Sequence, residues 1–113
     1  MIYAIDFDGT IVENNFPKIG KLIPEAVEFI KAIRKNGDKW ILYTMREEEY
    51  LVEALSFLAL HNLSPDAAND NLPEICEFYK NNPRKIFANV YIDDHNAGGL
   101  CFEFAKKKQV ENK

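Results

Sequence analysis

The chain has 113 residues, a length that favours a single domain, residues 1–113, built around one hydrophobic core. Hydrophobic residues form 47% of the chain and charged residues 28%, a balance that argues against a disordered or coiled-coil protein. A net charge of −4 argues against a broad nucleic-acid-binding surface, although a single phosphate group needs only a local positive site.

The sequence carries no sign of a membrane or secreted protein. No apolar run approaches the roughly 20 residues of a membrane helix, and the residues after Met1 lack a basic region and a cleavage site. Cys76 and Cys101 are isolated among apolar residues, which indicates buried, reduced thiols. We therefore expect a cytoplasmic protein that does not bind membranes, with the basic run 106–108 as a solvated last turn of helix.

Short apolar runs alternate with helical patterns along the chain. Strands are predicted at 2–5, 39–43 and 88–92, with a weaker one at 66–68. Residues 13–21 are predicted to form an irregular loop or a hairpin excursion, and helices are predicted at 24–37, from 47 onward, at 72–79 and at about 99–108. The apolar sides of the second and third helices are Leu51, Val52, Leu55, Leu58 and Ala59, and Ile75, Phe78 and Tyr79. This alternation predicts an α/β fold of three layers, Rossmann-like, with a central parallel sheet covered by helices on both faces.

Three predicted strands end in residues suited to phosphate chemistry, namely Asp6, Thr44 and Asp93. In open parallel sheets, ligands bind outside the carboxyl ends of the strands, where the strand order reverses. If the first and last strands are neighbours, their carboxylates meet and need a hard cation to offset their repulsion. Oxygen ligands beside a phosphate favour Mg²⁺ as that cation.

Four segments stand out in order: Asp6-Phe7-Asp8-Gly9-Thr10, Leu42-Tyr43-Thr44, Lys85 and Ile92-Asp93-Asp94. Together they resemble the four motifs of the haloacid dehalogenase superfamily of phosphohydrolases, over most of the chain. The segment from Arg84-Lys85 to Gly98-Gly99 further resembles a subgroup of very small bacterial and phage members. The resemblance implies the fold of that superfamily and the hydrolysis of a phosphorylated substrate.

The resemblance also implies a role for each residue that matches a motif. Asp6 is the implied nucleophile, which forms an aspartyl-phosphate, and Asp8 is the implied general acid and base. Mg²⁺ is implied to bind the Asp6 carboxylate, the Asp8 backbone carbonyl and the Asp93 side chain. Thr44 is implied to bind a phosphoryl oxygen, and Lys85 to balance charge.

Residues beside these motifs complete the predicted site. Gly9 fits a tight turn whose backbone N–H groups approach the phosphate, and Thr10 follows it. Arg46, at the mouth of the site, is either a substrate contact or a surface arginine at a helix start. Asp94 is expected behind the ligand Asp93, although the sequence leaves open which of the two binds the metal.

Other assignments also have alternatives. Asp6 and Asp8 are also compatible with a metal-free turn or helix cap, and Thr44 with an N-cap for a helix over 46–49. Lys85 lies only eight positions before Asp93, so Lys80 and Arg84 remain candidates for the cation. His95 is expected on the substrate side or in a structural role.

Spacing predicts a bare core domain. Asp8 lies 36 positions before Thr44, and Thr44 lies 41 before Lys85, and the predicted elements use up both intervals. No room is left for the cap domain that the superfamily usually carries, so the site is expected to be open to bulky, nucleotide, nucleic-acid or sugar phosphates, or completed by a second copy of the chain. The alternatives are a catalytically idle phosphate- or Mg²⁺-binding module and, less favoured because of Asp8, a dehalogenase.

Overall fold

The computed structural model describes residues 1–95. Several predictions fall outside the described residues, namely those for the tail helix at 99–108, Cys101, Gly98, Gly99 and the basic run 106–108. Within them, no helix combines the length and the apolar character that crossing a membrane requires.

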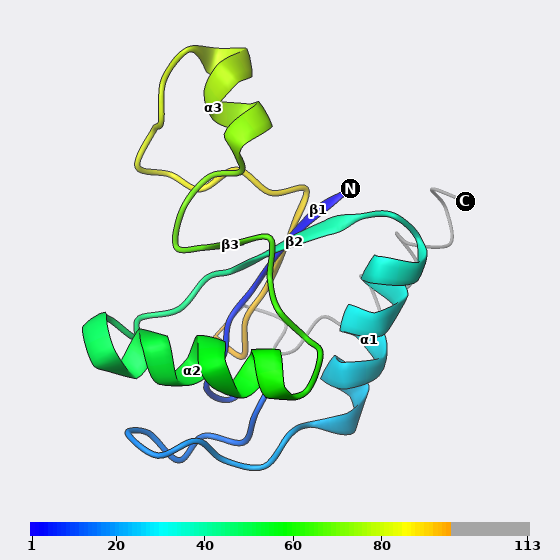
Figure 1. Cartoon of the computed structure of the whole chain (residues 1–113), viewed down its shortest axis with the longest axis vertical. Coiled ribbons are helices and arrows are strands. Elements are labelled where there is room, and N and C mark those ends of the chain that lie inside the picture. Colours follow the sequence, from blue (N-terminus) through cyan, green and yellow to red (C-terminus); the bar gives the residue numbers. More distant parts are fainter. Residues whose placement is uncertain (96–113) are drawn as a thin grey trace.

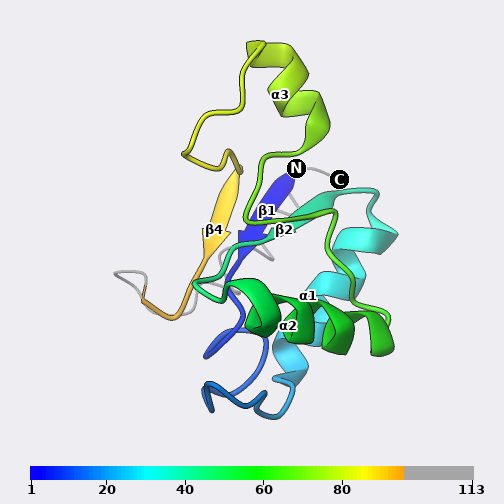
Figure 2. The same cartoon turned by 60° about the vertical axis from the view of Figure 1, so that its left-hand side comes forward.

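Four parallel strands form one sheet in the order β3-β2-β1-β4, and their bounds are Ile2–Ile5 for β1, Lys39–Leu42 for β2, Ala67–Ala68 for β3 and Val90–Ile92 for β4. Strand β1 pairs with both β2 and β4, and Ile5 lies opposite Leu42 on one side and Ile92 on the other. The chain runs outward from β1 to β3 and then returns to the far side of β1. The strand order therefore reverses between β1 and β4 (Figure 2), and the predicted parallel α/β sheet is confirmed.

Three helices lie between the strands, with bounds Pro24–Lys35 for α1, Glu48–Leu60 for α2 and Pro73–Tyr79 for α3. Pro24 begins α1 at a position that needs no backbone donor, and Gly37 follows its end with a positive φ of 74°. Helices α1 and α2 pack on one face of the sheet, around a core that includes Trp40 and Phe29. On the other face, a smaller cluster joins Ile41 of β2 to Leu72 and Ile86, which flank α3.

Helices α2 and α3 differ from their predicted packing. Val52 and Ala59, predicted on the apolar side of α2, are exposed, Val52 by 61%. Leu58 is buried as predicted, and Ala54, which was not predicted there, is the other buried position. Phe78 and Tyr79 are also exposed, because α3 stands beyond the end of the sheet where β1 begins (Figure 1). Periodicity identified these helices but not the direction that each turns toward the core.

The predicted hairpin excursion is present between β1 and α1. Val12 and Leu22 form an antiparallel bridge, and the Glu13 N–H donates to the Lys21 carbonyl at 2.8 Å. The excursion lies at the end of the sheet where β1 finishes, opposite to α3 (Figures 1 and 2).

Candidate functional site

Three carboxylates meet at the carboxyl ends of β1 and β4, where the strand order reverses. The Asp6 N–H donates to the Ile92 carbonyl at 3.0 Å, which aligns the ends of the two strands. Asp6, Asp93 and Asp94 each contribute one carboxylate oxygen to a cluster in which all three oxygens lie within 4.8 Å of one another. The predicted convergence of Asp6 and Asp93 is therefore present, and Asp94 lies in the same cluster.

Burial and mutual repulsion shift the titration of this cluster. The pKa of Asp6 is raised from 3.8 to about 7. Burial is the largest cause, the charges of Asp93, Asp94 and Asp8 contribute to the rise, and a hydrogen bond from the Phe7 N–H opposes it. Burial also raises the pKa of Asp94, and the adjoining Asp93 carboxyl adds to the increase. The site thus disfavours its own negative charge.

A hard divalent cation fits this donor set. One Asp94 oxygen, Oδ1, is buried and accepts no hydrogen bond, and His95 Nε2 lies 3.7 Å from it, beyond hydrogen-bond distance. Carboxylate oxygens are the type of ligand that Mg²⁺ prefers, and a cation would offset the repulsion between these three groups. Asp6, Asp93 and Asp94 are the side chains that would hold the ion.

Gly9 and Thr10 hold the acidic loop against the first motif. Gly9 has a φ of +83°, and a Cβ at this position would stand 2.4 Å from Asp94 Oδ2. Thr10 is fully buried, and its hydroxyl accepts the Asp94 N–H at 3.3 Å. Both residues, predicted near the substrate, therefore position Asp94 in this structure.

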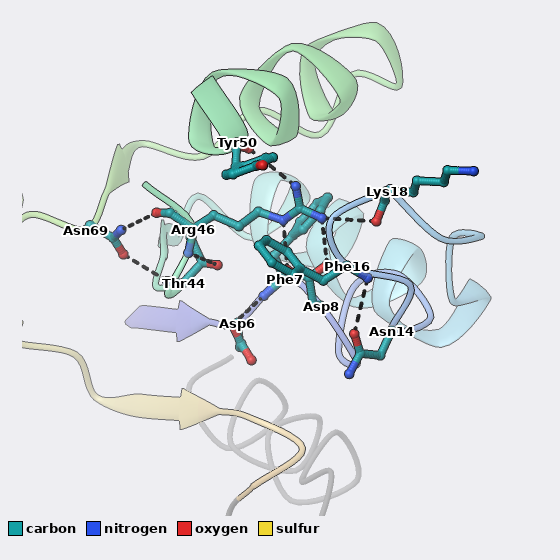
Figure 3. A network of polar contacts seen from close by, with 10 residues as sticks. All are labelled: Asp6, Phe7, Asp8, Asn14, Phe16, Lys18, Thr44, Arg46, Tyr50 and Asn69. Carbon is teal, nitrogen blue, oxygen red and sulfur yellow. Dashed lines mark hydrogen bonds and ion pairs between the residues drawn. The ribbon is translucent and has the colours of Figure 1, made fainter. Parts of the chain in front are cut away.

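Asp8 turns away from the carboxylate cluster and pairs with Arg46 (Figure 3). Arg46 Nε donates to one Asp8 oxygen at 2.7 Å, and Nη2 donates to the other at 2.8 Å. Both Asp8 oxygens are acceptors in this bidentate pair, which stabilises the charged carboxylate.

Arg46 is buried, with only 2% of its surface exposed, although a surface arginine was one of the two predictions. Its guanidinium lies between the rings of Phe7 and Phe16, at 5.1 and 5.0 Å from their centroids. It also donates to the carbonyls of Lys18 and Tyr50, at 3.2 and 3.4 Å. One side chain therefore connects the first motif, the excursion and the first turn of α2.

Thr44 lies beside the cluster at the end of β2. Its hydroxyl accepts the Arg46 N–H at 3.2 Å, and its N–H donates to Asn69 Oδ1 at 2.8 Å. Helix α2 begins only at Glu48, so Thr44 closes a local turn and is not the predicted N-cap of a helix over 46–49. Because the Thr44 oxygen serves as acceptor, its own O–H remains available to a ligand.

These residues line one open cleft of about 590 Å³. Its floor holds the predicted residues Asp6, Asp8, Thr44, Arg46 and Asp93, and the lining also includes His95, Asn14, Phe16, Tyr43 and Met45.

Lys85 is not brought to this cleft. The chain meets the amino-terminal end of β1 only at Asn89, whose N–H donates to the Ile2 carbonyl at 2.8 Å. Lys85 precedes that contact, is exposed and is not among the lining residues, and the same holds for Lys80 and Arg84. Arg46 and His95 are the basic side chains of the described cleft.

Asn69 is a site residue that sequence reasoning missed. Its side chain accepts the Thr44 N–H and donates to the Arg46 carbonyl at 3.5 Å, so it fixes both residues from β3 (Figure 3). The available signal was its position directly after the weak strand at 66–68, where the carboxyl edge of a parallel sheet places ligands.

Comparison with solved structures places the chain in a family. A conserved protein coded by a locus of Bacteroides thetaiotaomicron matches it with a TM-score of 0.85, at 38% sequence identity over 100% of this chain and 92% of that chain. The chain belongs to the family of that conserved protein. No protein-family model matches the sequence, and none of the curated proteins does.

We expect Gly9→Ala to weaken divalent-cation binding about tenfold or more, because its Cβ would displace the Asp94 carboxylate. The matched control is Gly37→Ala, which has a similar positive φ but nothing within 4 Å of the added Cβ. Both changes place a Cβ at a positive φ, which costs roughly 1–2 kcal/mol of stability, whereas titration calorimetry with Mg²⁺ should separate them. Equal affinities in the two variants would contradict the contact's role.

We expect Asp6→Asn to stabilise the metal-free protein at alkaline pH. The pKa of Asp6 is about 7 when folded and 3.8 as the reference value, so the folded state binds more protons between these values. Its contribution to the free energy of unfolding therefore falls as pH rises from about 4 to 7. The difference in melting temperature between variant and wild type should grow over this interval and then level off. Glu53→Gln, at an exposed position of α2, is the control and should show no such trend.

We expect Arg46→Gln to lower the free energy of unfolding by roughly 3 kcal/mol, because it leaves a partly buried carboxylate without its partner. Arg34→Gln is the control, since Arg34 Nη1 donates to both oxygens of Asp66, but the Arg34 side chain is 42% exposed. Chemical denaturation should show a loss of about 1 kcal/mol or less there. Similar losses in both variants would argue against a special role for the buried pair.

Proposed function

We propose that the chain is a Mg²⁺-dependent phosphohydrolase of the haloacid dehalogenase type, with Asp6 as its nucleophile. The observation that carries this proposal is the position of Asp6 in an open cleft at the strand-order reversal, beside two further carboxylates. This is the position at which parallel α/β sheets bind ligands.

An Asp6 oxygen would attack phosphorus in line with the leaving oxygen. A bond forms between Asp6 and phosphorus as the bond from phosphorus to the leaving oxygen breaks, and water then hydrolyses the aspartyl-phosphate. Asp6, Asp93, Asp94 and, as the resemblance implies, the Asp8 backbone carbonyl would hold Mg²⁺, which would supply charge neutralisation for the phosphoryl group. The Thr44 hydroxyl can donate to a phosphoryl oxygen, because its acceptor role toward Arg46 leaves its hydrogen available.

Asp8 is proposed both to donate a proton to the leaving oxygen and to take one from water, and its pair with Arg46 bears on both roles. With each oxygen accepting one hydrogen bond from Arg46, the carboxylate keeps further lone pairs, so it can take a proton from the hydrolytic water. Donation to the leaving oxygen requires Asp8 to carry a proton first. Leaving groups that need no proton, such as aryl anions, avoid this requirement.

The proposed enzyme has no cap domain. The interval between Asp8 and Thr44 contains the excursion, α1 and β2, and the interval from Thr44 to Lys85 contains α2, β3 and α3. These elements use up both intervals, which supports an open site. Lys85 has no part in the proposed mechanism, since it lies away from the cleft.

A phosphate- or Mg²⁺-binding module without turnover is the second candidate. The observation that favours it is the Asp8–Arg46 pair, in which the proposed general acid accepts two hydrogen bonds and donates none. An intact nucleophile and Thr44 hydroxyl favour the enzyme instead.

Turnover of an aryl phosphate with Mg²⁺ tests the proposal. We expect Asp6→Asn to abolish activity, and Asp8→Asn to reduce it by roughly 10²–10⁴ for alkyl phosphates but less for aryl phosphates. Lys85→Ala should remain within about twofold of wild type, because Lys85 does not line the cleft. Undiminished activity in Asp6→Asn would exclude Asp6 as the nucleophile, whereas binding of phosphate without turnover in the wild type would favour the binding module.

A further inference from the structure

Large apolar side chains stand exposed at the mouth of the cleft. Phe16 is 53% exposed, Tyr43 45% and Met45 96%, and all three line the cleft that contains Asp6. We call these three residues the rim. Exposed apolar groups gathered around a polar floor are typical of ligand-binding sites.

The two aromatic rings of the rim are held in place from behind. Phe16 packs over the guanidinium of Arg46, and its ring meets Tyr50 at a centroid distance of 5.4 Å. The ring of Tyr43 meets the ring of Tyr91 of β4 at a centroid distance of 6.2 Å. Supported rings that keep exposed surface offer preorganised stacking faces.

Met45 differs from the rings because its backbone is fixed while its side chain is free. Thr44 before it is bound to Asn69, and the Arg46 N–H after it is bound to Thr44. A methionine in this setting provides a flexible, polarisable thioether, which adapts to the edge or face of an aromatic ligand.

We propose that the rim binds a planar aromatic ring in the leaving group of the substrate, and that this ring is a nucleobase. This inference rests on the proposed function, since a phosphoryl group at Asp6 directs the rest of the substrate outward past the rim. The cleft of about 590 Å³ is in the range of sites that hold whole small molecules, and a lone phosphate does not need it. The Asn14 side chain on the lining adds an amide that suits the polar edge of a base.

A nucleobase fits the charge of the cleft better than an extended anionic ligand does. The described floor carries Asp6, Asp8 and Asp93 against the basic groups of Arg46 and His95, and Arg46 is already paired. These charges suit a ligand with a single phosphate, bound together with a cation, whose remaining part is an uncharged ring. The expected substrate is therefore a nucleoside monophosphate.

The decisive comparison is kcat/KM for a nucleoside 5′-monophosphate against ribose 5-phosphate, measured with Mg²⁺. The two share the same type of ester and leaving oxygen, so a difference reports the base alone. Stacking on aromatic side chains changes affinity by roughly 5- to 150-fold, and we expect the nucleotide to be preferred about tenfold or more.

Variants of the rim show where the preference arises. Tyr43→Ala and Met45→Ala should lower the nucleotide preference and leave kcat/KM for ribose 5-phosphate nearly unchanged. Phe78→Ala is the control, because it removes an aromatic side chain that is 76% exposed on α3, away from the cleft. It should leave the preference intact. Phe16 is left unchanged in this test, because its ring also packs on Arg46.

An aryl ester is the other source of a planar ring, and O-phosphotyrosine tests it. The ratio of variant to wild-type kcat/KM cancels the intrinsic reactivity of each leaving group. A larger effect of Tyr43→Ala on phosphotyrosine than on the nucleotide would overturn the nucleobase and assign the ring to an aryl ester.

The remaining outcomes separate this inference from the proposed function. Equal kcat/KM for nucleotide and ribose 5-phosphate, with Asp6-dependent turnover of both, would overturn the rim's role and leave the phosphohydrolase standing. A dimer in solution that Met45→Ala dissociates would assign the rim to a second copy and overturn it as well. No turnover of any phosphate ester would overturn both proposals.

Discussion

The buried guanidinium of Arg46 is the interaction on which the geometry of the cleft depends. It neutralises Asp8, lies between two aromatic rings and donates to carbonyls in the excursion and in α2. These partners are far apart in the chain, from Phe7 to Tyr50. A charged group buried this deeply is tolerated only with such partners, so its demands fix the surrounding loops in one arrangement. The cleft is consequently shaped by a charge that itself does not face solvent.

That pair also divides the acidic groups of the site into two sets. Asp8 is neutralised within the protein, whereas Asp6, Asp93 and Asp94 share a space without a basic partner in reach of a hydrogen bond in the described residues. Burial, together with the charges of the neighbouring carboxylates, raises the pKa of Asp6 to about 7, so the folded state loses stability as pH rises toward that value. A site in which carboxylates are crowded and partly buried is suited to binding a cation and to holding a nucleophile. The stability that this crowding costs is offset by the large hydrophobic core against α1 and α2.

Most of the fold and about half of the site geometry could be predicted from the sequence, for a physical reason. Strand periodicity located β1, β2 and β4, and parallel pairing then necessarily gathers the residues that follow them, so Asp6, Thr44 and Asp93 came together as expected. Lys85 was different, because a motif's order along the chain does not say at which end of the sheet it lies. The burial of Arg46 was also out of reach, since its partner Asp8 is 38 residues away and the pairing depends on how two loops meet.

The rim is exposed and the site is open for the same reason: α3 and the cleft lie at opposite ends of the sheet. Helix α3, the largest departure from a compact α/β unit, stands at the amino-terminal end of β1, where it cannot cover the cleft (Figure 1). Among the described residues, the short excursion and the turn before α2 reach the other end, and both are tied to Arg46. These contacts hold the side chains at the mouth in place, so we expect recognition there to come from those side chains. Phe16 and Tyr43 supply such fixed surfaces, because each packs against another ring, and only Met45 can still adapt.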